Sequence, residues 1–539
     1  MRKKRQSWKN SGIWLILLFL TVRPLFSAEP IPADSPEYYF RFKIADRAEL
    51  AQLTRVISID NVRDSIVTAY ANHEEFSAYE ELGYKYEILP HPGSLYKPRM
   101  SKSLKEAQNW NSYPTYETYI TLMHQFAENY PQICRIERIG YSVQGRELLA
   151  VKISDNVTVN DAEPDLFYTS TMHGNETVGW ILMLHLIDTF LTNYGNDERL
   201  TNLVDNAEIW INPLANPDGT FYLSNSSIYG ARRYNYNGVD LNRNFPDPAE
   251  GDHPDGKVWQ PETIAMMEFA GKHHFVLSAN FHTGAELVNY PWDTWQRHHP
   301  DDSWLLDISR EYALTAQANS PSGYFTELGG YINGYQWYRI CGGRMDWMTY
   351  FQGCRETTIE LSGTFLPAEN TLTDYWNYNK EALIGYLENV FSGINGIVTD
   401  RLDRPLPARI SLVEHDTEID RSAIGNDPDT GDFYRLCAPG NYTVTVTTGN
   451  LSAKTFENVT ITADQITQLN VRFDDFARGD VNADGQIDVR DVVAILQFNR
   501  QRATPDSLQA IAADWNSDGA VDSKDVSDLM KYIVGADSK

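Results

Sequence analysis

The feature that most constrains the fold is an alternation of strand-like and helical segments between residues 111 and 391. The strand-like runs are short and contain several apolar residues each, as in buried strands. The segments between them repeat apolar residues at helical spacing. This order predicts an α/β domain with a mixed, mostly parallel sheet and helices on both faces. The strand runs are residues 148–153, 165–171, 207–212, 275–280 and 357–361, and the helical segments are residues 116–128, 178–191, 261–270 and 375–391.

Further domains are expected on both sides, because 539 residues are too many for one core. Residues 36–93 alternate strand and helix signals in the order β-α-β-α-β and predict a small α/β domain. Residues 94–110 are polar and predict a linker. Residues 393–474 hold short strand-like runs between Pro, Gly and Asp turns, which predicts a β-sandwich.

The N-terminus has the order of an export signal. Five basic residues lie within residues 1–10, an apolar run covers residues 13–22, and the small residues Ser27 and Ala28 follow. We therefore expect a signal peptide over residues 1–28 and a secreted, extracellular protein. An uncleaved anchor is the alternative, but the run is shorter than the ~20 residues of a membrane span. No later segment is apolar enough, so we expect no membrane span in the mature protein.

The charge and the cysteines exclude some classes. With 73 acidic and 46 basic residues, a net charge of −27 does not favour nucleic acid or an anionic membrane. The four cysteines Cys134, Cys341, Cys354 and Cys437 allow three disulfide pairings, among which the sequence does not choose. No Cys-x-x-Cys pair is present, which argues against a cysteine zinc site.

Candidate metal ligands follow two of the predicted strands. His173 and Glu176 lie between the strand run 165–171 and the next helix, at the carboxyl edge where open α/β sheets build their sites. His282 follows another strand run and supplies the third ligand that a catalytic zinc needs. Taken alone, His-x-x-Glu is a weak signal, because Glu is also favoured at a helix N-terminus.

Neighbouring residues strengthen this interpretation. Asn242 and Arg243 suit a carboxylate, because a guanidinium binds both of its oxygens and an amide adds a donor. Asp240 is placed to hold the free ring nitrogen of His173. Glu360 lies inside an apolar strand run, where a charge is costly unless it has a partner or a function. The alternative for Glu360 is an exposed position on an edge strand.

Five motifs in residues 111–391 together resemble zinc metallocarboxypeptidases of the carboxypeptidase N/E/D subfamily, and they occur in that subfamily's order. The resemblance implies one catalytic zinc ion on His173, Glu176 and His282, with Glu360 as the general base. The motifs are His173-Gly-Asn-Glu176, Gly238-Val-Asp-Leu-Asn-Arg-Asn-Phe-Pro246, Asn289-Tyr-Pro-Trp-Asp293, Asn333-Gly-Tyr-Gln-Trp-Tyr338 and Ile359-Glu360-Leu-Ser362.

The same resemblance assigns the substrate contacts. Asn242 and Arg243 would bind the C-terminal carboxylate of the substrate, and Tyr338 would cap the bound chain. Arg233 matches the arginine that polarises the scissile carbonyl, with Arg232 as its rival. The implied function is a secreted zinc metallocarboxypeptidase that hydrolyses the C-terminal bond of peptides or proteins. An inactive binding protein and a hydrolase of cell-wall peptides stay open as alternatives.

The preferred C-terminal residue is less determined. Asp293 matches an acidic residue that favours C-terminal Lys or Arg in this subfamily. Where the subfamily usually has Met-Gln, however, this chain has Arg344-Met345. A cation at this point would oppose a basic side chain, so the expectation is a basic or broad preference.

The flanking regions also resemble known modules. Residues 393–473 resemble the transthyretin-like sandwich that follows many catalytic domains of this subfamily. Residues 36–90 resemble the N-terminal extension of bacterial carboxypeptidases, which suggests a pro-segment.

A repeat near the C-terminus predicts two calcium sites. The twelve residues from Asp480 recur from Asp514, with Asp or Asn at positions 1, 3, 5, 9 and 12 and Gly at position 6. Residues 478–536 resemble a type I dockerin, which implies two structural calcium ions and a cohesin-bearing scaffold as partner. An acidic solvated surface is the alternative. The expected ligands are Asp480, Asn482, Asp484, Gln486 (backbone), Asp488 and Asp491 in the first loop, and Asp514, Asn516, Asp518, Ala520 (backbone), Asp522 and Asp525 in the second.

Overall fold

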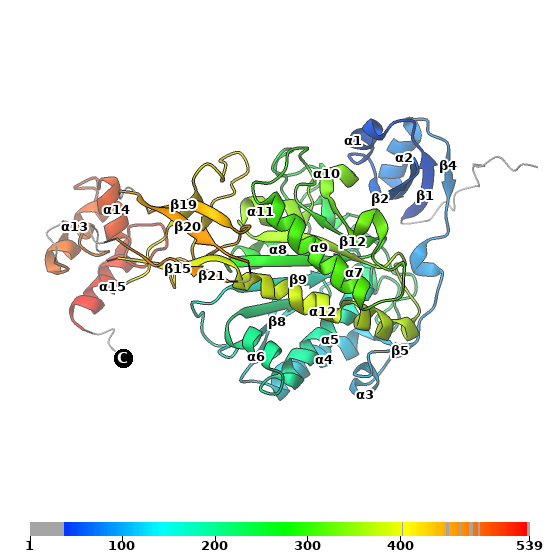
Figure 1. Cartoon of the computed structure of the whole chain (residues 1–539), viewed down its shortest axis with the longest axis horizontal. Coiled ribbons are helices and arrows are strands. Elements are labelled where there is room, and N and C mark those ends of the chain that lie inside the picture. Colours follow the sequence, from blue (N-terminus) through cyan, green and yellow to red (C-terminus); the bar gives the residue numbers. More distant parts are fainter. Residues whose placement is uncertain are drawn as a thin grey trace, which may run out of the picture.

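The computed structural model describes residues 37–400, 403–448, 452–463, 465–473, 478–482 and 486–535. The expected signal peptide and Asp484 lie outside these residues. Figure 1 shows a large central α/β domain, with the N-terminal domain against one side and the β-strands of residues 393–473 on the other. Three C-terminal helices lie beyond those strands, at the far end of the molecule.

The N-terminal domain is an antiparallel sheet in the order β2-β3-β1-β4. The order along the chain is β-α-β-β-α-β, one strand more than expected. The additional strand is β2, which the sequence pattern missed because it contains the polar residues Asp60 and Asn61; both are buried. The elements are β1 (Tyr38–Lys43), α1 (Leu50–Leu53), β2 (Ser58–Arg63), β3 (Ile66–Ala71), α2 (His73–Glu81) and β4 (Tyr86–Ile88).

The segment 94–110 does not have the form of the expected linker. It contains strand β5 (Met100–Ser101), which pairs with β6 (Tyr113–Pro114), and helix α3 (Leu104–Ala107). Ala107 and Trp110 are buried in the largest hydrophobic core. The segment therefore packs as part of the central domain, although most of its residues are polar.

The central sheet is mixed, and its middle is parallel. The strands lie in the order β13-β12-β14-β11-β9-β10-β8-β7, in which β14, β11, β9 and β10 are mutually parallel. The β12–β13 pair is also parallel, and the remaining pairs are antiparallel. The strands are β7 (Cys134–Tyr141), β8 (Glu147–Ile153), β9 (Asp165–Ser170), β10 (Glu208–Asn212), β11 (Phe275–His282), β12 (Glu286–Tyr290), β13 (Tyr331–Asn333) and β14 (Arg355–Leu361).

Helices cover both faces of this sheet, as expected from the strand pattern. Leu166 and Tyr168 of β9 belong to the core that packs against one set of helices, and Phe167 between them belongs to the core on the opposite face. This alternation follows from the two-residue period of a strand. The first set is α4 (Tyr116–Asn129), α5 (Val178–Asn193), α6 (Glu198–Asp205), α9 (Asp302–Ala318) and α12 (Leu372–Glu388), and the second is α8 (Pro261–Ala270) and α11 (Arg344–Phe351).

Residues 393–473 form two sheets, β18-β15-β21, with β22 also paired to β15, and β17-β16-β19-β20. Asp301 of the central domain joins them through a buried network. Its Oδ2 lies 2.9 Å from both Arg355 Nε and Arg435 Nη1, and its Oδ1 lies 2.7 Å from His415 Nε2. The strands are β15 (Gly393–Asp400), β16 (Arg409–Leu412), β17 (Ile424–Gly425), β18 (Asp432–Arg435), β19 (Gly440–Thr447), β20 (Lys454–Ile461), β21 (Ile466–Gln468) and β22 (Val471–Phe473).

The C-terminal helices α13 (Val489–Asn499), α14 (Ser507–Ala513) and α15 (Ser523–Ile533) share one core with these sheets. At the junction, the guanidinium of Arg404 lies 4.5 Å from the ring of Trp515 and 5.7 Å from that of Tyr532. All four cysteines are buried and unpaired. None of the helices among the described residues has the length and apolar character to cross a bilayer.

Candidate metal centre and substrate site

Three predicted ligands meet at the carboxyl end of the parallel strands. His173 follows β9, Glu176 precedes α5, and His282 ends β11. Their ligand atoms lie within 4.8 Å of one another, and all three side chains are buried. The turn that brings His173 and Glu176 together depends on Gly174, because a Cβ there would lie 2.3 Å from the Gly219 carbonyl carbon.

Hydrogen bonds orient these side chains. His173 Nδ1 lies 2.8 Å from Glu176 Oε1, and His282 Nδ1 lies 2.9 Å from Glu176 Oε2. The other ring nitrogen of His173 lies 3.0 Å from Asp240 Oδ1, an arrangement that leaves Nδ1 for a metal. Burial opposes ionisation of Asp240, but Arg233, His173 and Arg243 hold the pKa of its carboxyl well below the usual range. Two imidazole nitrogens and one carboxylate are the donor set of a catalytic zinc site, so these residues fit zinc.

A second group of potential ligands, Asp301, His415 and Asp416, does not fit a metal. Two guanidinium groups, from Arg355 and Arg435, already occupy the Asp301 carboxylate. Cations in these positions would repel a metal ion.

Glu360 lies beside the metal ligands. It is paired in register with His282 across β11 and β14, and β14 is an inner strand, so the alternative of an exposed edge position is wrong. Its Oε2 is buried without a hydrogen-bond partner. Burial, together with the carboxylate of Glu176, raises the pKa of Glu360 well above that of an ordinary Glu.

The two candidate arginines, Arg232 and Arg233, lie in different surroundings. Arg233 Nη1 lies 3.1 Å from Glu176 Oε1, and its Nε lies 3.1 Å from Asp240 Oδ2. Arg232, its rival in the sequence, instead lies over the ring of Tyr222 at 5.6 Å. The geometry thus favours Arg233 as the cation beside the metal ligands.

One pocket collects all the zinc-binding, catalytic and substrate-binding residues that the sequence predicted. The free space in this pocket is about 20 Å³, enough for one water molecule, which needs ~10–15 Å³ by the same measure. It is lined by Asp60, His173, Glu176, Arg233, Asn242, Arg243, His282, Thr283, Asn289, Asp293, Trp337, Tyr338, Ile340, Thr358 and Glu360.

Comparison with known proteins agrees with this geometry. The zinc carboxypeptidase family profile matches residues 119–382. Carboxypeptidase M of Mus musculus is 36% identical over 337 residues, which are 60% of this chain and 74% of that protein. The chain belongs to the zinc carboxypeptidase family. The carboxypeptidase N catalytic chain of Homo sapiens is 33% identical over 64% of this chain and 82% of its own length.

Other comparisons define the limits of the similarity. Human carboxypeptidase D is 36% identical over 71% of this chain, but the match spans only 28% of that longer protein. The crystal structure of carboxypeptidase A from Helicoverpa armigera matches with a TM-score of 0.50 and 17% identity, covering 65% of this chain and 96% of that one. The dockerin type I profile matches residues 478–534, in agreement with the repeat.

Asp293 lines the same pocket as the metal ligands. This side chain is buried, and its Oδ1 accepts a hydrogen bond of 2.9 Å from Asn289 Nδ2. Burial raises the pKa of Asp293 to about 7. Asp293 forms no ion pair with any described residue.

The expected opposition from Arg344 does not arise. Its side chain is fully buried outside the pocket lining, 3.1 Å from Glu356 Oε2 and with its guanidinium 4.9 Å from the ring of Phe167. Met345 instead approaches the pocket wall, where its Sδ lies 3.8 Å from Thr358 Oγ1. Glu356 thus offsets the positive charge of Arg344, which was the reason to doubt a preference for C-terminal Lys or Arg.

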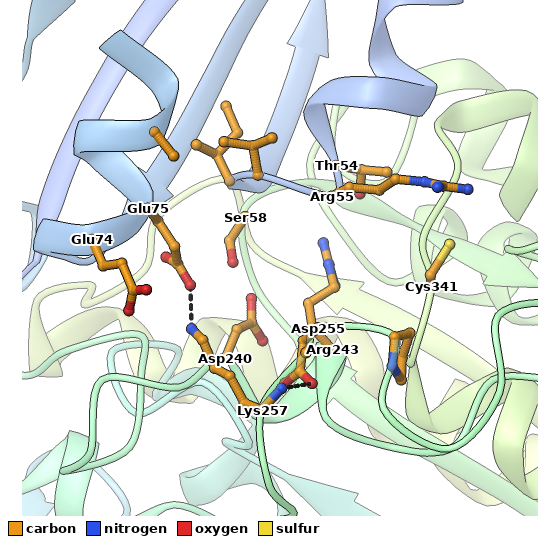
Figure 2. Close-up of a pocket in the computed structure, with 15 residues that line it drawn as sticks. Thr54, Arg55, Ser58, Glu74, Glu75, Asp240, Arg243, Asp255, Lys257 and Cys341 are labelled. Carbon is orange, nitrogen blue, oxygen red and sulfur yellow. Dashed lines mark hydrogen bonds and ion pairs between the residues drawn. The ribbon is translucent and has the colours of Figure 1, made fainter. Parts of the chain in front are cut away.

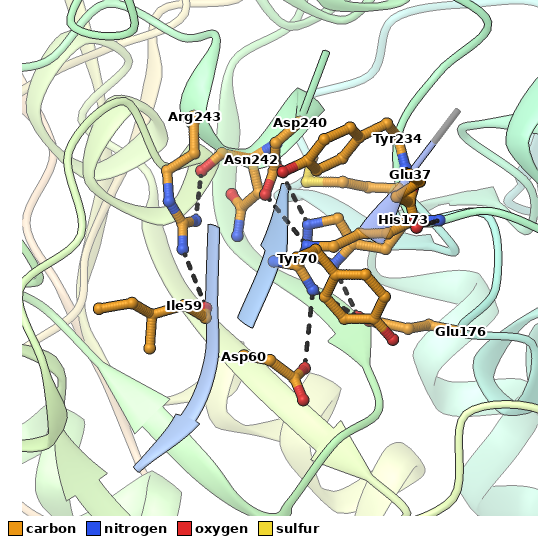
Figure 3. A network of polar contacts seen from close by, with 12 residues as sticks. Glu37, Ile59, Asp60, Tyr70, His173, Glu176, Tyr234, Asp240, Asn242 and Arg243 are labelled. Carbon is orange, nitrogen blue, oxygen red and sulfur yellow. Dashed lines mark hydrogen bonds and ion pairs between the residues drawn. The ribbon is translucent and has the colours of Figure 1, made fainter. Parts of the chain in front are cut away.

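The N-terminal domain covers this site, as Figure 3 shows for strand β2. Arg243 Nη2 donates to the backbone carbonyl of Ile59 at 3.4 Å, and Asp60 Oδ1 lies 3.8 Å from Arg233 Nη1. Asn61 Nδ2 donates to the carbonyl of Gly284 at 3.1 Å. No motif signalled these contacts, because they join residues far apart in the sequence.

Further contacts hold the N-terminal domain in place. Glu37 accepts hydrogen bonds of 3.1 Å from the backbone N–H groups of Arg233 and Tyr234. Between the two domains lies an open cavity of about 360 Å³, bridged by Lys257 and Glu75 (Figure 2). Arg243 lines this cavity as well as the carboxypeptidase pocket.

The dockerin loops present oxygen ligands. In the second loop, Asp514 accepts from the N–H groups of Asp518 and Gly519 at 3.1 and 2.9 Å. Asp525 is fully buried and accepts from the N–H of Asp522 at 2.8 Å. In the first loop, Asp491 accepts in the same way from the N–H of Asp488 at 2.9 Å. An all-oxygen donor set on tight loops fits calcium.

Proposed function

We propose that this chain is a zinc-dependent carboxypeptidase that removes the C-terminal residue from peptides or proteins. One observation carries the proposal: His173, Glu176 and His282 converge in the pocket that Glu360 and Arg243 also line. The presence of every expected ligand and of the general base argues against an inactive binding protein.

Each side chain has its own role in the proposed reaction. Zinc held by the three ligands would act as a Lewis acid that acidifies water and polarises a carbonyl. Glu360, in its ionised form, takes the proton from the attacking water and passes it to the leaving amine. Arg233 donates to the carbonyl oxygen as negative charge develops there.

Arg243 and Asn242 make the enzyme an exopeptidase. Their donors bind a carboxylate, and only the end of a chain supplies one at this distance from the scissile bond. Tyr338 lines the same pocket, where it would close over the bound residue.

The substrate class in this proposal is peptides that end in Lys or Arg. Asp293 provides a buried carboxylate that no cation pairs with among the described residues, and Glu356 offsets Arg344. A cationic side chain would supply the missing partner of Asp293. The test is a panel of peptides that differ only in the last residue, with an amidated peptide as control. Release of Arg and Lys ahead of Leu supports the proposal; cleavage of the amidated peptide or of mucopeptides alone would favour the cell-wall hydrolase.

The N-terminal domain is proposed to act as a pro-segment that keeps the enzyme latent. The Ile59 carbonyl contacts the arginine that would bind the substrate carboxylate, and Asp60 faces Arg233. The space of about 20 Å³ left in the pocket admits no peptide.

Latency is tested by weakening the contacts between the N-terminal domain and the carboxypeptidase domain and measuring the activity. The opened variant is the full-length chain with Asp60→Ala, Asn61→Ala and Asn72→Ala, which remove three side-chain contacts with Arg233, Gly284 and Gly238. Asn61 and Asn72 each lose a hydrogen bond that contributes about 1 kcal/mol, and Asp60 loses an ion pair, so kcat/KM for an unblocked peptide should rise about tenfold or more. Arg41→Ala is the control, because Arg41 pairs with Glu87 inside the N-terminal domain. Equal activity of the opened variant and the native chain would contradict latency.

The flanking modules are proposed to place the enzyme outside the cell. The signal-like N-terminus would direct export, and residues 393–473 would serve as a transthyretin-like structural spacer. The dockerin would bind two calcium ions and attach the enzyme to a cohesin-bearing scaffold. Loss of binding to the cohesins of such a scaffold when the second loop carries Asp514→Ala supports this attachment; unchanged binding would oppose it.

A further inference from the structure

A second buried carboxylate, that of Asp346, contacts the backbone of Asp293. Asp346 is in the first turn of α11, and only 1% of its surface is exposed. Its Oδ1 accepts a hydrogen bond of 3.0 Å from the backbone N–H of Asp293, and its Oδ2 accepts one of 2.8 Å from the N–H of Thr294. One carboxylate thus binds two consecutive backbone amides at the residue that faces the substrate side chain.

The surroundings leave Asp293 little freedom. Asn289 holds its Oδ1 from one side. On the other side, a Cβ on Gly334 would lie 1.8 Å from the same oxygen. Asp247 secures the neighbouring backbone, since its Oδ1 lies 3.1 Å from Thr294 Oγ1 and its Oδ2 lies 2.9 Å from the N–H of Gly342.

The position of Asp346 is electrostatically costly. Asp346 makes no ion pair with the described residues. Burial is the main cause that raises the pKa of its carboxyl, and the nearby carboxylates of Asp293 and Asp247 raise it further. Its compensation comes from backbone N–H groups and from its place at the start of a helix. A group that only filled space would not need this arrangement, because an apolar residue would cost less.

We infer that Asp346 is a positioning residue for substrate specificity: by binding the N–H groups of Asp293 and Thr294, it directs the Asp293 carboxylate toward a basic C-terminal side chain. This inference rests on the proposed basic preference. Asp346 lies outside the pocket lining and so acts through Asp293 rather than on the substrate.

The variant that tests this is Asp346→Asn, made in the full-length native chain and in the opened variant. An amide keeps one acceptor but places an NH₂ group against the second backbone N–H. We measure kcat/KM for two peptides that end in Arg or Leu and are otherwise identical. The Arg-to-Leu ratio should fall about tenfold, mainly through KM of the Arg peptide, with the zinc content unchanged.

The control is Asp218→Asn, in another fully buried carboxylate that also accepts from a backbone N–H, that of Gln144 at 2.7 Å. It should lower the melting temperature and leave the Arg-to-Leu ratio unaltered. Asp293→Asn should lower the ratio at least as much as Asp346→Asn.

The outcomes separate the two proposals. If Asp293→Asn lowers the ratio and Asp346→Asn does not, the positioning role is wrong and the basic preference stands. If neither changes it, the basic preference itself is wrong. Should Asp346→Asn fail to fold, Asp346→Glu keeps the carboxylate but moves its oxygens by one methylene, and a native ratio in that variant would overturn the inference.

Discussion

At the residue scale, the surroundings of each carboxylate in the pocket determine its role. Glu176 lies between two histidines and a backbone N–H from Thr283, a setting for an ionised ligand. Glu360 Oε2 has no hydrogen-bond donor among the described residues, and burial raises the pKa of this carboxyl. Asp293 accepts a hydrogen bond from the Asn289 amide and has no cationic partner among the described residues.

The pH dependence of substrate preference follows from Asp293. Its pKa is raised to about 7, so the carboxyl is neutral below that pH and ionised above it. Only the ionised form attracts a cationic side chain. The Arg-to-Leu ratio of kcat/KM should therefore rise as the pH increases through about 7, by up to about tenfold per pH unit on the acid side. A ratio that is flat between about pH 6 and about pH 8 would contradict this assignment.

The sequence could predict the site residues that stand in local motifs. His173, Glu176 and Glu360 each follow or occupy a strand run, so their meeting at one sheet edge follows from the topology. The partner of Arg344 could not be predicted, because Glu356 lies on another element and only the folded sheet brings the two together. Asp60 was missed for the same reason: its target, Arg233, lies in another domain.

At the element scale, the apolar pattern predicted the inner strands well and the outer ones poorly. All residues of β9, β10, β11 and β14 are buried, and their Ile, Leu, Phe and Val residues make the pattern visible even though β14 also holds Arg355, Glu356 and Glu360. Strand β7 is at the edge of the sheet, and its exposed positions carry polar residues that hide the pattern. Strand β2 was hidden because its polar residues bind the carboxypeptidase domain rather than water.

The loop before α15 gives a prediction at this scale. Four carboxylates from Asp514, Asp518, Asp522 and Asp525 repel one another unless a cation neutralises them. Removing calcium from the full chain, with zinc restored, should raise amide hydrogen exchange in residues 514–533 and leave β9 and β11 protected. Equal exchange with and without calcium would show that this loop does not bind the ion.

At the scale of the whole molecule, the modules are joined by packed interfaces. Arg404 is stacked on Trp515 and Tyr532, and the buried network around Asp301 joins the β-strand region to the carboxypeptidase domain. Separating the β-strand region from the carboxypeptidase domain would leave buried charges without partners, which is costly. The dockerin and the enzyme are therefore expected to keep a fixed orientation. The sequence could not predict these interfaces, because they depend on side chains from two domains.

The buried metal site is proposed to cleave peptides with Glu360 as the general base. The most direct measurement compares the opened variant with the same chain carrying Glu360→Gln, with one zinc ion bound in each, in release of the C-terminal residue from an unblocked peptide. Glu360→Gln is expected to lower kcat about 10²- to 10⁴-fold without loss of zinc. Equal rates in the two proteins, or no release by the zinc-loaded opened variant, would contradict this proposal.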